Sequence, residues 1–402
     1  MTMTATMDRP VLNLAALLPD AAALAPQLSV WRRHLHQHPE LAFQEHATSA
    51  WIAAQLQAMG GLVVTRPTPT SVMARLIGGM PGRTVAVRAD IDALPIQEEN
   101  AVPYCSTTDG VMHACGHDGH TSMLLGLAQL LATHRDAVRG EVRFFFQHAE
   151  ELAPGGAEEM IAAGVMAGVE VVIGVHLWSQ LPTGQIGLLA GAAMAAPDTF
   201  TCTITGRGGH AALPHDSVDP IAVGAQVVTA LQQVVSRQVN PLEPLVVSVT
   251  QFHAGTTDNV IPNSAMLSGT IRTFDATLRD QVPSMMERVI RGVCEAHGAT
   301  YTFRVERGYR PVVNDPAVTA QLRTLVTRVF GAERLATMTP LMVGEDFSAY
   351  QQHAPGVFAF IGSGNPQIDS TFPHHHPQFD LDEAALSAGL QYLTAATVEL
   401  LG

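Results

Sequence analysis

The chain contains no lysine, and all 22 of its basic residues are arginine. The absence of lysine excludes a Schiff base with pyridoxal phosphate, aldolase-type capture of a carbonyl group, and a phosphate-binding P-loop. A G-x-S-x-G nucleophile elbow is also missing, which disfavours a serine hydrolase of that type. The four cysteines are widely spaced and form no C-x-x-C motif, so a disulfide framework is not expected.

Positive charge is scarce in general. The 36 acidic residues outnumber the 22 basic ones, giving a net charge of -14, and no basic run occurs. Nucleic acids and anionic membrane surfaces are therefore disfavoured as partners. The apolar stretch 12–24 is interrupted by Pro19 and Asp20, and nowhere do 18 apolar residues run unbroken. We expect a soluble cytoplasmic protein that binds metals and small polar molecules.

The first and last parts of the chain alternate between apolar strands and helices, and an acid or a histidine follows several of the strands. The expected strands are 72–77, 84–88, 141–146, 169–175 and 357–361. The expected helices are 28–38, 45–59, one capped by Thr121 or Ser122, 318–330 and 382–401. Open α/β sheets place their sites beyond the ends of such strands, so we predict an α/β domain of this kind.

The order of the expected strands and helices changes between residues 199 and 307. Strand, helix, two strands, helix and strand follow one another there, which is the order of a ferredoxin-like unit. The expected elements are 199–205, 220–237, 245–252, 265–274, 277–297 and 301–305. We therefore expect a catalytic domain formed by 1–196 and 311–402, interrupted by an inserted domain at 197–310.

The segment 113–120 carries the densest chemistry in the chain, with three histidines, a cysteine and an aspartate. If the segment is extended, residues two apart share a face, so His113, Cys115 and His117 would point the same way. A thiolate and imidazoles at this spacing can hold one metal ion. The alternative is a polar loop whose histidines are satisfied by hydrogen bonds.

Three other segments carry candidate groups. Glu150 and Glu151 follow a strand, and at that position one can bind metal while the other acts as a base; a solvated acidic loop is the alternative. The histidines of 373–377 form either further ligands or a polar loop. His210 follows a glycine-rich turn and either binds a ligand or belongs to an ordinary turn.

These segments together resemble a known family. The matching stretches are 35–41, 88–95, 113–120, 147–151, 174–176, 206–215, 259–262 and 344–347, in order along the chain. They resemble the aminoacylase/carboxypeptidase group of dinuclear metallohydrolases, and most closely the branch of hippurate hydrolase and indole-3-acetyl-amino-acid hydrolase. The resemblance implies a zinc-aminopeptidase-like catalytic domain with a mixed sheet, and an inserted lid or dimerisation domain.

By position, the resemblance implies two divalent ions per subunit, of zinc, manganese, cobalt or nickel. The implied ligands are Cys115, His117, Glu151, His176 and His375. Cys115 would be shared between the ions, and Glu150 would be the general base and acid. His375 fits the family's H-x-P-x-F context, but His374 and His376 flank it and leave the choice open by one position.

The resemblance also assigns residues outside the metal centre. His210, supplied by the inserted domain of a partner subunit, would stabilise the oxyanion. Asn259 and Arg272 would bind the substrate's α-carboxylate. Asp90 and Asp92 would orient the ligands. A homodimer or homotetramer formed through the inserted domain follows from these roles.

The function implied is hydrolysis of the amide bond of an N-acyl amino acid by metal-activated water. A carboxypeptidase or dipeptidase on the same scaffold is the second reading, and a non-catalytic metal- or peptide-binding relative is the third. His148 departs from the family pattern, because many relatives have proline there.

Overall fold

The computed structural model describes residues 12–402, and these residues form two compact units. Unit 1 contains the described residues up to Gly191 together with Val313–Thr339 and Asp346–Gly402. Unit 2 contains Ala192–Val312 and also Pro340–Glu345, a short late segment that the sequence did not indicate. Residues 1–11 of the expected first domain lie outside the described residues. Unit 1 is therefore discontinuous in sequence.

Unit 1 is built on an eight-stranded mixed sheet with the order β1-β2-β4-β3-β5-β16-β6-β15. Its strands are β1 (Val63–Thr65), β2 (Val72–Ile77), β3 (Met80–Asp90), β4 (Arg139–Gln147), β5 (Val171–Pro182), β6 (Ile186–Gly187), β15 (Leu335–Ala336) and β16 (Gly356–Gly364). The central strands β4, β3, β5 and β16 are parallel neighbours, whereas β2 is antiparallel to β4 and β6 is antiparallel to β16. The carboxyl ends of the four parallel strands therefore share one edge of the sheet.

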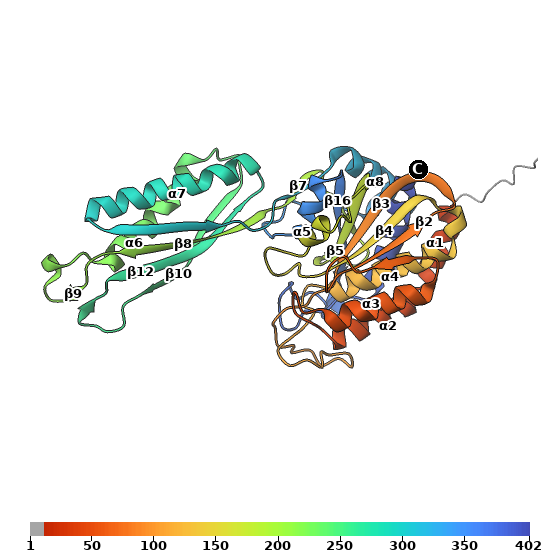
Figure 1. Cartoon of the computed structure of the whole chain (residues 1–402), viewed down its shortest axis with the longest axis horizontal. Coiled ribbons are helices and arrows are strands. Elements are labelled where there is room, and N and C mark those ends of the chain that lie inside the picture. The colour runs from red at the N-terminus through yellow and green to blue at the C-terminus, as the bar shows by residue number, and fades with distance from the viewer. Residues whose placement is uncertain (1–11) are drawn as a thin grey trace, which may run out of the picture. The chain divides into compact units, whose positions relative to one another are not determined.

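Helices cover one face of this sheet in two layers (Figure 1). The inner helices are α3 (His46–Met59), α4 (His117–Thr133) and α9 (Ala384–Leu401), and α1 (Leu14–Ala23) and α2 (Ala25–Gln37) pack on α4 and α9. The helix α8 (Pro316–Phe330) packs beside α9. Because successive residues of a strand face opposite ways, Phe144 of β4 joins the core under α4, while the ring of Phe145 lies 5.5 Å from that of Tyr350. Tyr350 belongs to the short helix η5 (Asp346–Gln352), which packs against α5 (Ala157–Ala162) on the other face.

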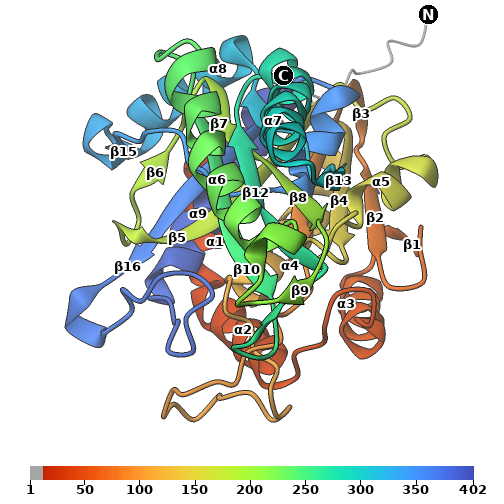
Figure 2. The same ribbon diagram turned by 90° about the vertical axis from the view of Figure 1, so that its left-hand side faces the viewer.

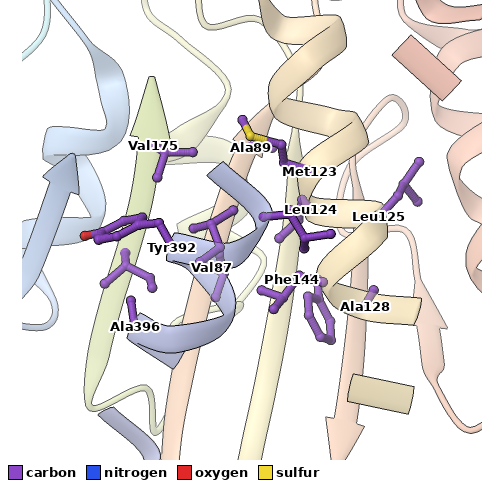
Figure 3. Close-up of a cluster of buried hydrophobic side chains, with 14 of the residues drawn as sticks. Val87, Ala89, Met123, Leu124, Leu125, Ala128, Phe144, Val175, Tyr392 and Ala396 are labelled. Atoms are coloured by element: carbon purple, nitrogen blue, oxygen red, sulfur yellow. The ribbon is translucent and has the colours of Figure 1, made fainter. Parts of the chain in front are cut away.

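The centre of unit 1 is a continuous apolar core between the sheet and α4 and α9. Val87, Phe144 and Val175 from three strands meet side chains of the two helices, labelled in Figure 3 as Met123, Leu124, Ala128, Tyr392 and Ala396. A side chain at Gly126 would come within 2.7 Å of Leu28 and 3.0 Å of Leu390, so this glycine lets α4 approach α2 and α9 closely. The core fixes the N-terminal end of α4, where the metal-binding candidates begin.

Unit 2 has the ferredoxin-like topology expected from the order of its elements. Its four-stranded antiparallel sheet has the order β10-β12-β8-β13, with α6 and α7 packed together beside it (Figures 1 and 2). The elements are β8 (Ala196–Thr205), α6 (Pro220–Gln233), β10 (Leu245–Ala254), β12 (Ser264–Thr273), α7 (Ala276–His297) and β13 (Thr300–Glu306). The short strands β9 (Gly209–His210) and β11 (Val260–Ile261) pair with each other, and β7 (Gly191–Met194) and β14 (Val312–Asn314) lie where the chain passes between units.

All the expected strands are observed, although the one expected at 169–175 extends to Pro182 as β5. One further helix was not expected, and the expected start of another is wrong. The segment with Pro19 forms a helix, α1, which buries Leu17 and Ala21. The helix α4 begins at His117, not after Thr121 or Ser122, because Gly116 takes a left-handed conformation (φ 87°) and turns the chain into the helix earlier. Placing the helix start correctly changes which side chains can reach a metal.

Among residues 12–402, no single helix is long and apolar enough to cross a membrane. Helices α1 and α2, which are bent by 49° relative to each other, would together be long and apolar enough, by length and composition only.

Candidate metal centre

The candidate ligands converge at the carboxyl edge of the sheet in unit 1. β3 ends at Asp90 and β4 at Gln147, three residues before Glu150. His176 lies on β5 opposite Phe360 of β16. Segments far apart in the sequence thus deliver polar groups to one place, as the strand-end pattern predicts.

His117 is the first residue of α4, and its two ring nitrogens have different surroundings. Nδ1 donates to the backbone oxygen of Asp92 at 3.0 Å and lies 3.2 Å from its Oδ1. Nε2 is buried and has no hydrogen-bond partner among the described residues. Burial opposes a charge on this ring, but Asp90 and Asp92 outweigh it and raise the pKa of His117 to about 10. The carboxylates therefore favour a cation at this nitrogen, whether a proton or a metal ion.

Cys115 and His176 lie side by side, with Sγ 3.5 Å from Nε2. The Nδ1 of His176 donates to the carbonyl of Leu177 at 2.7 Å, so Nε2 carries the lone pair that a metal requires. Burial, followed by the charges of Glu151 and Glu150, holds the pKa of the Cys115 thiol well above its ordinary value. A metal ion that converts this thiol to a thiolate must therefore displace its proton.

Glu151 faces His375, and its Oε1 lies 3.3 Å from the Nε2 of that ring. The same oxygen is 3.8 Å from Nε2 of His117, is buried and has no hydrogen-bond partner among the described residues. The backbone N–H of Glu151 donates to Oδ2 of Asp92 at 2.9 Å, which fixes the segment. Asp92 thus orients both His117 and Glu151, as the sequence predicts for it.

The five predicted ligands therefore gather in one place. Within 4.8 Å of one another lie the ligand atoms of two sets, Cys115 with His117 and His176, and Cys115 with Glu151 and His375. Cys115 belongs to both sets, as a ligand shared by two ions would. Cys115, His117 and His176 are buried and His375 is exposed, and a donor set of one thiol, three imidazoles and one carboxylate fits zinc and its neighbours in the first transition series.

Glu150 lies against these ligands. One of its carboxylate oxygens is within 4.8 Å of ligand atoms of both His117 and Glu151, and its side chain is buried. The backbone of Ala149 before it has a positive φ of 49°, which turns Glu150 and Glu151 out of the strand. His148, the departure from the family pattern, bonds Glu159 at 3.0 Å and so ties this segment to α5.

One expectation about the opening segment is wrong. Because Gly116 turns the chain and α4 begins at His117, residues 113–117 are not one extended run. His113 is buried instead with its ring 6.4 Å from that of His36. No metal-capable group among the described residues contains His113.

A buried network of ion pairs and hydrogen bonds, whose connections the sequence did not reveal, lies next to the candidate ligands. Arg88 donates to Asp90 at 2.6 Å and to Asp346 at 2.7 Å. Asp90 in turn accepts a hydrogen bond from His120 at 2.6 Å. The sequence offered an arginine and two acids at the end of an apolar strand, and Asp346 in one of the matching stretches. Nothing in the sequence joined Asp346 to Arg88, which is 258 residues away.

The residues predicted in unit 2 do not gather in one place. His210 pairs with Val260 across β9 and β11, and the N–H of Ala211 bonds the backbone oxygen of Asn259 at 3.1 Å. Arg272 lies near the opposite end of β12, level with Pro197 of β8. His210 and Asn259 are thus neighbours, and Arg272 is remote from both within the unit.

Comparison with known proteins agrees with this architecture. Residues 86–399 match the model of peptidase family M20/M25/M40. An N-acyl-L-amino acid amidohydrolase of Geobacillus stearothermophilus is 63% identical over 71% of this chain and 77% of the relative. An N-acetylcysteine deacetylase of Bacillus subtilis is 42% identical over 92% of this chain and 96% of the relative.

A solved structure is also similar. It is a dinuclear metal-binding peptidase of the M20 family from Bacillus subtilis, with 38% identity and a TM-score of 0.82 over 94% of this chain and 99% of that one. The matched residues include the strands and helices that carry every candidate ligand. The chain belongs to peptidase family M20/M25/M40.

Proposed function

We propose that the protein is a metal-dependent amidohydrolase that cleaves N-acyl amino acids into a carboxylic acid and a free amino acid. The observation that carries the proposal is the position of Glu150, a carboxylate beside two sets of ligand atoms that share Cys115. Mere metal storage needs no carboxylate in addition to the five ligands, whereas hydrolysis needs a base beside them. The relatives named as an amidohydrolase and a deacetylase support the same reaction class.

In this proposal the ligands are Cys115, His117, Glu151, His176 and His375. When bound, two divalent ions would polarise the amide carbonyl and lower the pKa of water towards about 7. Glu150 takes the proton of the attacking water and passes it to the leaving amine. Zinc, manganese, cobalt and nickel all suit these donors, and the sequence and fold favour none of them.

The last ligand is assigned to His375 on geometric grounds. Its Nε2 lies 3.3 Å from Glu151, whereas Nε2 of His374 bonds the carbonyl of Leu177 at 2.9 Å. The ring of His376 stacks on Phe372 and its Nδ1 accepts the N–H of Gln378. The two flanking histidines are therefore engaged elsewhere.

We further propose that the active form is a homodimer or a homotetramer formed through unit 2. His210 would stabilise the oxyanion, and Asn259 and Arg272 would bind the α-carboxylate. Arg272 and the end of β12 nearest Asn259 are eight residues apart, or about 26 Å along an extended strand. One small substrate cannot touch both ends of the strand, so two copies of unit 2 are needed to supply all three groups. The cytoplasmic location stays a prediction.

The proposal is tested with purified protein, freed of metal and then loaded separately with zinc, manganese, cobalt or nickel. We expect hydrolysis of hippurate or of N-acetyl amino acids with at least one of these metals. A free dipeptide with the same C-terminal residue is the matched substrate, and faster cleavage of the dipeptide would favour the carboxypeptidase or dipeptidase reading. No turnover with any metal across a broad panel of acyl groups would refute the proposal.

A further inference from the structure

The backbone of Leu177 is held by three imidazole rings. Its N–H donates to Nε2 of His120 at 2.8 Å. Its carbonyl accepts from Nδ1 of His176 at 2.7 Å and from Nε2 of His374 at 2.9 Å. Because a carbonyl oxygen only accepts, His176 and His374 must each carry a proton on the nitrogen that faces it.

His374 is held firmly in the orientation that this bond requires. Its ring stacks on Trp178, with centroids 4.5 Å apart and planes at 23°, and lies 4.9 Å from the ring of Phe379. Its centroid is also 5.1 Å from that of His176. His374 therefore touches the side chain of one proposed ligand and shares its hydrogen-bond acceptor.

The neighbouring residue is the other proposed ligand from this region. The backbone of His375 has a φ of 66°, a left-handed conformation that is unfavourable for a residue with a side chain. Its N–H bonds the backbone oxygen of Ala114 at 2.8 Å, next to Cys115. This conformation aims the ring at Glu151, and it persists only if the segment is held on both sides.

We propose that His374 is a positioning residue that links the two halves of the metal centre. Through the carbonyl of Leu177 it fixes the side chain of His176, and through the chain it fixes the strained backbone of His375. The inference rests on the proposed metal centre and extends it to a residue that binds no metal. Among the described residues, no metal-capable group contains His374.

His374 makes a hydrogen bond to Leu177 and packs on Trp178, and two variants test these two contributions separately. His374→Phe keeps an aromatic ring on Trp178 but removes the donor to Leu177. His374→Gln removes the aromatic ring that stacks on Trp178 but keeps an N–H donor. The matched control is His376→Phe, on the other side of His375, because that ring stacks on Phe372 and bonds only within its own loop.

The experiment is a titration of the metal-free full chain with cobalt(II), followed by calorimetry and by the visible absorption of cobalt with its thiolate charge-transfer band. We expect His374→Phe to weaken cobalt binding about 10–100-fold and to alter the spectrum, as the loss of an orienting hydrogen bond does. His374→Gln should recover much of the loss, and His376→Phe should behave as the wild type.

The outcomes distinguish this inference from the function on which it rests. Wild-type affinity and spectrum in His374→Phe would overturn the positioning role while leaving the metal centre intact. A wild-type chain that binds no cobalt would overturn both. Equal losses in all three variants, with lowered melting temperatures, would show that the loop responds to any change and would also overturn the specific role of His374.

Discussion

Arg32 and Asp118 form an ion pair in which both side chains are fully buried, with Nε 2.9 Å from Oδ2. Asp118 is the chain neighbour of His117, and Arg32 also bonds Asp380 in the loop that follows His375. One guanidinium thus joins the two segments that carry candidate ligands at either end of the centre.

Arg32→Met is expected to destabilise unit 1 strongly, because it removes the guanidinium from the buried carboxylate of Asp118 and leaves His36 as its remaining charged partner. Removing one partner of a buried pair costs about 3–5 kcal/mol. The adjacent Arg33, whose side chain is 51% exposed and pairs with Glu383, is the matched control. Arg33→Met should cost less than about 1 kcal/mol. Urea denaturation of the two variants measures both values, and equal losses would contradict the assignment.

His36 should make stability depend on pH above neutrality. Burial opposes its charge, but hydrogen bonds to Asp118 and Glu98 outweigh it and raise the pKa of His36 to about 9. The folded state therefore holds a proton between about pH 6.5 and 9 that the unfolded state has lost. Stability from this group is complete below about pH 6.5 and disappears as the pH rises through 9.

The measurement is the free energy of unfolding from pH 6 to 10 for wild type and His36→Gln. The difference between them should shrink with rising pH by at most about 3 kcal/mol. His38→Gln, an exposed histidine of the same helix end, is the control and should show no such trend. A constant difference for His36→Gln would show that its proton is not retained in the folded state.

Glu150→Gln tests the proposed base. We expect kcat to fall about 10²–10⁴-fold, since a positioned base contributes a factor of this size. The metal content should be unchanged, because the five proposed ligands are intact. Glu158→Gln, an exposed acid on α5, should keep full activity. Full activity in Glu150→Gln would mean that another group takes the proton.

Cys115→Ser tests the proposed shared ligand. The test compares how strongly the wild type and the variant respond to removal of the metal. A metal that binds only the folded state stabilises it by about 2.7 kcal/mol at a concentration 100 times Kd. We expect chelation to lower the melting temperature of the wild type and added metal to restore it, whereas Cys115→Ser should lose most of this response. Cys105→Ser removes a half-buried thiol that bonds Asn100 and should keep the full response. Thermal melts with and without chelator decide between these results.

Mixed oligomers test whether unit 2 of one copy serves another copy. His210→Ala and Glu150→Gln should each be inactive alone. Co-expressed, they should regain activity, because each mixed dimer then contains one site with an intact Glu150 and a partner with an intact His210. His215→Ala, an exposed histidine in the same loop, should be active alone. No recovery in verified mixed dimers would show that His210 acts within its own chain or not at all.

Local patterns predicted the strands well and failed where one residue's conformation decides the structure. The strand expected at 72–77 is observed as Val72–Ile77, since an apolar run between turn residues leaves few alternatives. The start of α4 was misplaced because the left-handed backbone of Gly116 is set by its surroundings. The helix at 14–23 was not among the expected elements; it contains Pro19, and burial of Leu17 and Ala21 outweighs the penalty of a proline inside a helix.

The candidate ligands and the orienting residues Asp90 and Asp92 were nominated by spacing and resemblance, but the partners that hold them were not. Arg88 and Asp346 are 258 residues apart, and Arg32 and Asp380 are 348 apart. No local pattern joins such pairs, because only the closed sheet brings them together. The hydrogen bond from His374 to Leu177, 197 residues apart, is hidden for the same reason.

The place of β16 in the sheet has a consequence for the newly made chain. It lies between β5 and β6, yet the ribosome completes both of these strands and all of Ala192–Val312 before β16 is made. Until then, the nascent chain presents an unpaired edge of β5, which is a hazard for association with other chains. His375 emerges later still, so the full set of proposed ligands exists only after β16 has been made.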